Sequence, residues 1–191
     1  VTNEMVNYIL NTDTFKGYEF RYGYPVVGES LVVRENARTI RLFYGPQART
    51  VTVTYHDDKG AELQESFTLR RPYGSSYNVG DQIFDTLDID DHHYVKESVT
   101  GEVSGTVTSN VTVDVVYALD DKGDNGPDGT ADKYQVEVTY GAVNGTVSFN
   151  GPKYVTLYDE NGNESESGTG YLRNEQIPTT QANEGYGSGS W

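Results

Sequence analysis

Residues 120–133 form an acidic, glycine-rich stretch, and this acidic stretch carries the residues best suited to binding a metal ion. Asp124, Asp128 and Asp132 recur at every fourth position, and Gly129 directly follows the middle one. Calcium takes about six to eight oxygen ligands, and closely spaced aspartates around a glycine can supply them from one short loop. The spacing therefore predicts a calcium site at these three aspartates. Gly126 stands where a further ligand would be expected, so a solvated linker is the alternative.

Two adjacent histidines, His92 and His93, end an acidic run that begins at Asp88. Side chains of adjacent residues in an extended segment point to opposite faces. The two imidazoles are therefore poorly placed to share one metal ion. We interpret residues 88–93 as a polar loop and keep a metal site as the alternative.

Tyrosine is unusually frequent, with 16 copies, and its ring can stack on a sugar ring through an apolar face. The candidates for glycan contact lie in segments next to glycine or proline, where rings are often accessible: Tyr22, Tyr24, Tyr73 and Tyr77. The alternative is that these rings are part of the structure, because tyrosine is also favoured in β-strands.

No arrangement of residues predicts catalysis. The chain has three histidines and no cysteine, and no serine stands in the glycine-flanked elbow of a hydrolase. Carboxylate pairs carry no information in so acidic a chain. We therefore predict that the protein is not an enzyme.

Charge and composition exclude further classes of protein. The formal net charge is -15, from 29 acidic and 14 basic side chains, and the isoelectric point is about 4.4. Such a surface repels nucleic-acid phosphates and anionic lipid. No stretch approaches the roughly 20 apolar residues of a membrane span. The 21 glycines and the many threonines and valines, without cysteine, favour an extracellular β protein of a Gram-positive bacterium.

A sequence pattern occurs twice in the first two thirds of the chain. In each copy a mixed segment leads to a tyrosine, then to a glycine-punctuated stretch, and finally to an alternating run that ends in tyrosine. These closing runs are residues 39–44 and 111–117. A small unit that recurs in sequence is typical of a linear array of modules.

The second copy predicts a complete small module over residues 48–119. Strict alternation predicts a strand at 51–55, and a turn ending at Gly60 leads into a returning strand at 65–69. Apolar spacing over 79–87 predicts one short helix. Two more strands follow, at 94–98 and 106–117. This order is most simply packed as a β-grasp, with parallel first and last strands.

The remaining sequence divides around this module. Residues 1–47 correspond to the later part of a β-grasp module that lacks its N-terminal hairpin, with a short helix near Met5 to Leu10. Residues 120–133 form an acidic linker. Residues 134–191 form a small β module with strands at 134–140 and 154–158. The predicted fold class is mainly β (α+β): tandem β-grasp-like modules in an elongated array.

Residues 48–119 resemble the mucin-binding-protein (MucBP) repeat of Gram-positive surface adhesins. The resemblance rests on the V-x-V-x-Y strand at 51–55, the D-x-x-G turn at 57–60, the G-x-x-Y segment at 74–77, Tyr94, and the closing strand at 111–117. His92-His93 stand where the family usually has Pro-Gly. Residues 1–47 resemble the second half of the repeat, and 134–191 are similar to small β repeats of bacterial surface proteins. The acidic stretch resembles the aspartate-rich calcium loops of such proteins.

We therefore interpret the chain as a fragment of a cell-surface adhesin whose repeats bind mucin or host glycoprotein glycans. The alternative is a passive acidic spacer that presents a distal domain. We expect a monomeric rod, anchored to a bacterial cell wall through regions outside this sequence, with no nucleic-acid partner, no membrane insertion, and calcium as the one possible cofactor.

Overall fold

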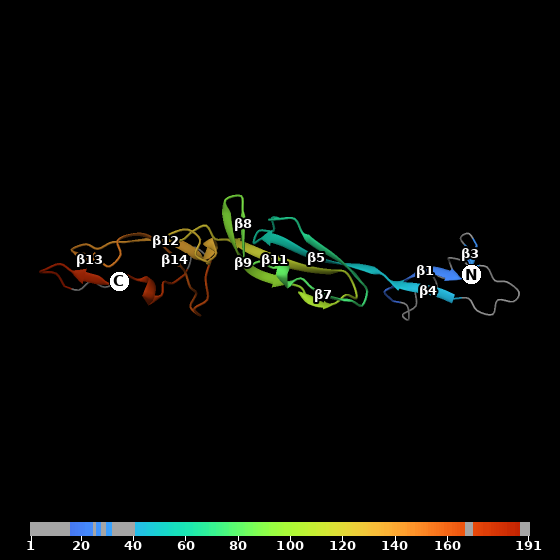
Figure 1. Ribbon diagram of the computed structural model, residues 1–191. Helices are drawn as coiled ribbons and strands as arrows, with labels where there is room; N and C mark the ends of the chain where they lie inside the picture. Colours follow the sequence, from blue (N-terminus) through green and yellow to red (C-terminus); the bar gives the residue numbers. More distant parts are fainter. Residues whose placement is uncertain (1–15, 25, 28–29, 32–40, 167–169, 188–191) are drawn as a thin grey trace. The chain divides into compact units, whose positions relative to one another are not determined.

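The computed structural model describes residues 16–24, 26–27, 30–31, 41–166 and 170–187, and these residues are mainly β (Figure 1). The helices in this described part are three-residue 3-10 turns: η2 (Gly80–Gln82), η3 (Asp132–Tyr134) and η4 (Asn174–Gln176). The strands are β1 (Tyr18–Tyr24), β2 (Val26–Val27), β3 (Ser30–Leu31), β4 (Arg41–Pro46), β5 (Ala48–Asp57), β6 (Phe67–Pro72), β7 (Ser76–Asn78), β8 (Thr86–Ile89), β9 (His92–Thr100), β10 (Ser104–Thr106), β11 (Val111–Leu119), β12 (Gln135–Tyr140), β13 (Gly145–Val147), β14 (Gly151–Thr156) and β15 (Thr180–Ala182).

The largest sheet has five strands in the order β6-β5-β11-β9-β8. β5 pairs antiparallel with β6, and β8 pairs antiparallel with β9. Between β5 and β11 the amide of Thr50 donates to Asn110 Oδ1 at 3.0 Å, and the hydroxyl of Thr54 donates to Asp114 Oδ1 at 2.6 Å. Both contacts join residues 60 apart, so the two strands run in the same direction.

The chain divides into two compact units, and β5, β9 and β11 each contribute residues to both. The first unit comprises residues 1–54, 64–83 and 99–114. Its core follows from the alternation of β5 and β11, because every second side chain of a strand faces the same side. The buried hydrophobic residues of this unit are Val51, Val53, Tyr77, Val79, Val107 and Val113.

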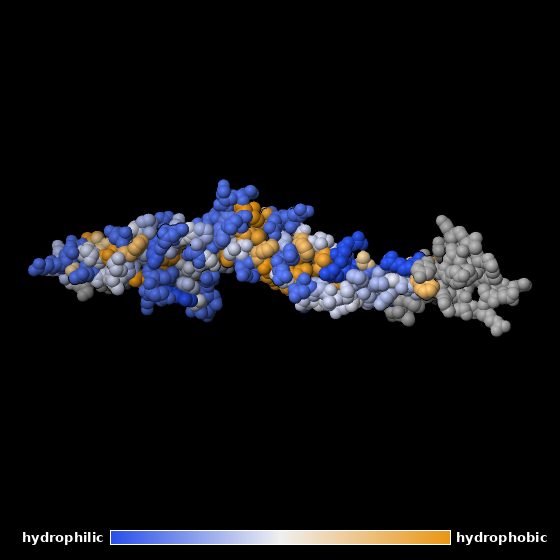
Figure 2. Space-filling model, in the orientation of Figure 1, coloured by the Kyte–Doolittle hydropathy of each residue, from blue (hydrophilic) through white to orange (hydrophobic). Residues whose placement is uncertain are grey.

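The second unit comprises residues 55–63, 84–98 and 115–191. Tyr55 stacks on Phe84 with ring centroids 6.3 Å apart, and the hydroxyl of Tyr117 donates to the carbonyl of Phe84 at 3.0 Å. Its buried hydrophobic residues are Tyr55, Leu87, Val115, Tyr117, Ala118, Ala131, Tyr140, Val155 and Leu157. Figure 2 shows hydrophobic residues concentrated in the part of the chain that contains β5, β9 and β11.

The predicted strands at 51–55, 65–69, 94–98 and 106–117 correspond to β5, β6, β9 and β11, while β10 ends at Thr106, where the last predicted strand begins. The predicted helix over residues 79–87 is wrong. Only η2 is helical there, and β8 begins at Thr86. Leu87 is buried while its neighbours Thr86 and Asp88 are exposed, which is the alternation of a strand. Pairing with β9 therefore overrides a local apolar spacing that also fits a helix turn.

The predicted helix near residues 5–10 lies outside the described residues. The part of residues 1–47 that is described contains the antiparallel pair of β1 and β4, with a bulge between Phe20 and Tyr22. The Gln47 amide after β4 donates to the Gly17 carbonyl at 2.7 Å. In the same way the Asp120 amide after β11 donates to the His93 carbonyl at 2.8 Å. The two sequence copies thus end with the same backbone hydrogen bond.

A second structural repetition links the turn after β5 to the turn after β14. Asp57 Oδ1 accepts the amides of residues 59 and 61, at 2.9 and 2.7 Å. Asp159 Oδ1 accepts the amides of residues 161 and 163, both at 2.8 Å. Gly60 and Gly162 have φ angles of 88° and 84°, which favour glycine. The D-x-x-G sequence therefore folds in the same way at both positions.

Two glycines of the first unit provide a test of its packing. Gly101 has a φ of 104°, and a Cβ there would lie 2.4 Å from the carbonyl oxygen of Thr112. Gly74 has a φ of 81°, and its Cβ would meet nothing within 4 Å. We expect Gly74→Ala to lower the free energy of unfolding by about 1 kcal/mol through backbone strain alone. Gly101→Ala adds a backbone clash, so we expect about 3 kcal/mol. Urea denaturation measures both values, and equal effects would contradict this packing.

Candidate functional site

The tyrosines predicted to contact glycans differ in exposure. Tyr77 is buried, and its hydroxyl donates to the carbonyl of Glu102 at 2.8 Å, so the expectation of an accessible ring is wrong for this residue. Its ring lies against Gly105, the residue opposite it on β10, where a Cβ would be 3.5 Å from the ring carbon Cε1. Tyr22 and Tyr24 lie on β1, and their side chains are outside the described part of the structure.

Tyr73 is half-buried and belongs to a packed cluster at the start of β5. Gly17 lies against its ring, because a Cβ on that glycine would be 2.2 Å from the ring carbon Cγ. Tyr18 meets the ring edge-on with centroids 6.0 Å apart, and the Arg49 guanidinium carbon lies 6.0 Å from the ring centroid. The Tyr73 amide also donates to the carbonyl of Gln47 at 2.8 Å. The Tyr73 ring therefore has a structural role, because it packs against Gly17, Tyr18 and Arg49.

Strand register places further basic residues near this cluster. Arg49 on β5 lies directly opposite Arg71 on β6, and Thr50 lies opposite Arg70. The guanidinium of Arg49 donates to Gln47 Oε1 at 2.6 Å. Among the residues that the structure describes, none of these three arginines has a carboxylate within ion-pair distance.

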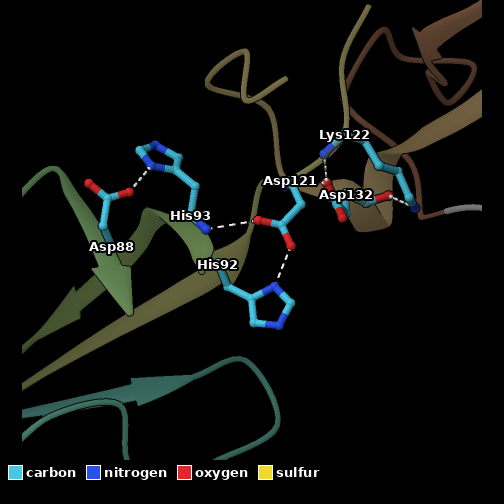
Figure 3. Close-up of polar contacts among 6 residues, drawn as sticks. All are labelled: Asp88, His92, His93, Asp121, Lys122 and Asp132. Carbon is cyan, nitrogen blue, oxygen red and sulfur yellow. Dashed lines mark hydrogen bonds and ion pairs between the residues drawn. The ribbon is translucent and has the colours of Figure 1, made fainter. Parts of the chain in front are cut away.

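Two histidines at the start of β9, next to the turn that follows β8, lie beside separate carboxylates (Figure 3). His92 Nδ1 lies 2.5 Å from Asp121 Oδ2, and His93 Nδ1 lies 2.6 Å from Asp88 Oδ1. The rings point to different partners, as the alternation of an extended segment predicts. The main-chain amide of His93 also donates to Asp121 Oδ1 at 2.8 Å. Asp121 thus connects the acidic stretch to the start of β9 through two hydrogen bonds within the second unit.

These contacts shift the ionisation of Asp121 and His92. The hydrogen bond from the His93 amide, together with the one from His92, holds the pKa of Asp121 below its usual value. The hydrogen bond to Asp121 and the charge of that carboxylate raise the pKa of His92. An open hollow, lined by the turn residues together with Asp121 and Pro127, lies beside the two histidines.

The acidic stretch uses its carboxylates mainly as acceptors for main-chain amides. Asp132 Oδ1 accepts the amides of Asp121 and Lys122, at 3.0 and 2.9 Å (Figure 3). Asp128 Oδ1 accepts the amide of residue 130 at 3.0 Å, and Asp124 Oδ1 accepts that of residue 154 at 3.0 Å. Across the described ranges, no group of three or more histidine, aspartate or glutamate side chains is placed to hold a metal ion.

Asp120 anchors the same stretch from inside the protein. It is fully buried, and its carboxylate accepts the amides of Asp128 at 3.2 Å and Gly129 at 2.8 Å. Burial raises the pKa of Asp120, and the two amide hydrogen bonds oppose that rise. The sequence alone did not single out this residue, because one aspartate of an acidic run looks like any other.

Lys133 is a second residue that sequence reasoning missed. Its ammonium contacts Glu97 Oε1 and lies 3.4 Å from Asp58 Oδ2. The hydroxyl of Tyr134 donates to the same Glu97 oxygen at 3.1 Å. Burial lowers the pKa of Lys133, but the hydrogen bond and charge of Glu97 outweigh that effect, so the pKa is raised. The contact joins β9 to η3 and the turn after β5, all within the second unit.

Comparison with known proteins identifies one segment of the chain. The family model of the MucBP domain matches residues 50–118. The match confirms the resemblance of residues 48–119 to a MucBP repeat and indicates a mucin-binding repeat of the surface-adhesin type. MucBP domains occur in surface-associated proteins and are a binding family rather than an enzymatic one.

No curated protein matches the sequence. Among the described residues, no helix has the length and apolar character needed to cross a membrane.

The pairing of His92 with Asp121 predicts a pH-dependent contribution to stability. The folded protein has a raised His92 pKa, so the contribution is fully present below the ordinary value of 6.5 and is lost as the pH rises through the raised value. We expect His92→Gln to lower the urea midpoint at pH 5.5 and to leave it unchanged above pH 8. Asp121→Asn should remove the same pH dependence, and an effect of His92→Gln that is equal at both pH values would contradict the pairing.

The calcium prediction for Asp124, Asp128 and Asp132 stays a prediction, and the geometry suggests its test. If these carboxylates serve only as acceptors for amides, the melting midpoint of the chain is the same in calcium and in chelator. A bound ion would instead raise the midpoint as the free calcium concentration increases. Such a rise, abolished by Asp128→Asn, would show that the loop rearranges to take the ion.

Proposed function

We propose that this chain is a fragment of a cell-surface adhesin whose MucBP segment binds mucin or other host glycoprotein glycans. The observation that carries the proposal is the match of the MucBP family model to residues 50–118. The order of the five-stranded sheet supports it, because β5 and β11 lie side by side in the same direction, as the first and last strands of a β-grasp do. We therefore propose a β-grasp-like module in which the 3-10 turn η2 stands where a helix was expected.

The proposed location follows from the same family. We propose that the protein is exported and displayed on a Gram-positive bacterial surface. Its net charge of -15 keeps neighbouring copies apart and disfavours nucleic acid as a partner. The competing function is that of a passive acidic spacer, which would bind no sugar.

Binding of the full chain to immobilised mucin tests the proposed function. We expect saturable binding at physiological salt that falls when the mucin is enzymatically deglycosylated, because glycans supply the ligand. A glycan array then identifies the sugars involved. A spacer would give no signal on either surface, and binding that survives complete deglycosylation would contradict recognition of glycans.

A further inference from the structure

We propose that Arg49 and Arg71 form a binding site for the carboxylate or sulfate group of an acidic saccharide. The inference rests on the proposed function for the source of its ligand, and it goes further by assigning the site and the chemical class of the group bound. It starts from the register of β5 and β6, which sets these two arginines directly opposite each other.

The register places both side chains on one face of the sheet. Directly opposite residues of an antiparallel pair have Cβ atoms about 4.5 to 5.5 Å apart and project to the same side. Val51 and Val53, on the same face of β5 as Arg49, are buried. The two arginines therefore lie at the end of the inner face, where β5 and β6 leave the core. Figure 2 shows strongly hydrophilic residues where β4 gives way to β5.

Arg49 is held in position before any ligand arrives. Its guanidinium donates to Gln47 Oε1 at 2.6 Å and lies over the ring of Tyr73. That ring is itself packed against Gly17 and Tyr18. A guanidinium fixed by its neighbours loses less conformational freedom when it binds an anion, so this arrangement favours binding.

Within the described part of the structure, the two arginines have no carboxylate counter-ion. Like charges directly opposite on neighbouring strands destabilise a sheet. Carboxylates outnumber basic side chains by 29 to 14 in this chain, yet none among the described residues pairs with Arg49 or Arg71. An anion between the two guanidiniums would offset their repulsion through charge-assisted hydrogen bonds, which are the strong ones.

The charge of the whole chain narrows the class of ligand. The net charge of -15 would repel a polyanion along its whole length. A single carboxylate or sulfate interacts mainly with the two nearby arginines, which attract it. Charges farther away than about 8 Å are largely screened at physiological salt. A saccharide with a single acidic group and no other charge therefore fits this site better than a nucleic acid does.

Arg70 provides an internal control. It is exposed, adjacent to Arg71, and has the same charge, but strand alternation directs it to the opposite face, beside Thr50. Arg70→Gln and Arg71→Gln change the net charge equally. Any effect of general electrostatics is therefore the same in both variants, and a difference between them reports the site.

The experiment is an NMR titration of the full chain with three probes: N-acetylneuraminic acid, galactose 6-sulfate and galactose. We expect at least one acidic probe to shift the side-chain signals of Arg49 and Arg71, and galactose to shift neither. Arg71→Gln should weaken that binding about tenfold or more, which is the size expected for a lost charge-assisted contact. Arg71→Lys should be intermediate, and Arg70→Gln should bind like the wild type.

Each outcome decides the proposal. Shifts with one acidic probe alone would assign the carboxylate or the sulfate as the bound group. Three results would overturn the site: no shift with either acidic probe, equal shifts with galactose, or equal losses in Arg70→Gln and Arg71→Gln. Because Arg71 is exposed, its variants are expected to fold, and their melting midpoints confirm this.

Failure of this site and failure of the proposed function are distinguishable. If the chain binds mucin but neither acidic probe shifts the arginines, the site is wrong and glycan binding stands. If the acidic probes bind through Arg71 but mucin is not bound, the anion site stands and the adhesin proposal is wrong.

Discussion

The register of β5 is the constraint on which the rest of the described structure depends. Alternation buries Val51, Val53 and Tyr55, and a slip of one residue would turn these side chains to the opposite face. The same register aligns Thr54 with Asp114 on β11 and sets Arg49 opposite Arg71 on β6. Core burial therefore fixes where the polar and basic side chains of this strand lie, including those proposed to bind an anion.

Aspartate has a structural role in this acidic chain beyond its contribution to solubility. Asp57 and Asp159 cap equivalent turns, Asp120 and Asp132 hold the acidic stretch, and Asp121 receives the His93 amide. Each carboxylate satisfies main-chain donors that a loop without regular pairing would leave exposed. Much of the negative charge that makes the sequence look like a solvated linker thus organises irregular backbone between the strands.

The match of residues 50–118 to the MucBP domain indicates a repeat of a binding family. A mainly β segment with a small core of valine and tyrosine leaves most polar side chains at its surface, and recognition then depends on how those side chains are grouped. In this acidic chain Arg49 and Arg71 lie opposite each other with no carboxylate partner among the described residues, and the fold holds Arg49 over the ring of Tyr73. This grouping connects the family match to a specific chemistry of recognition.

The sequence by itself determined the mainly β class, the strands β5, β6, β9 and β11 within residues 48–119, the D-x-x-G turns and the resemblance to MucBP. These follow from local alternation and from glycines that take positive φ, which act within a few residues. Tertiary structure alone decided that residues 86–89 form a strand, that Tyr77 is buried, and that Arg49 faces Arg71. These outcomes depend on pairing between segments that are distant in the chain, and local spacing carries no information about which strand lies opposite.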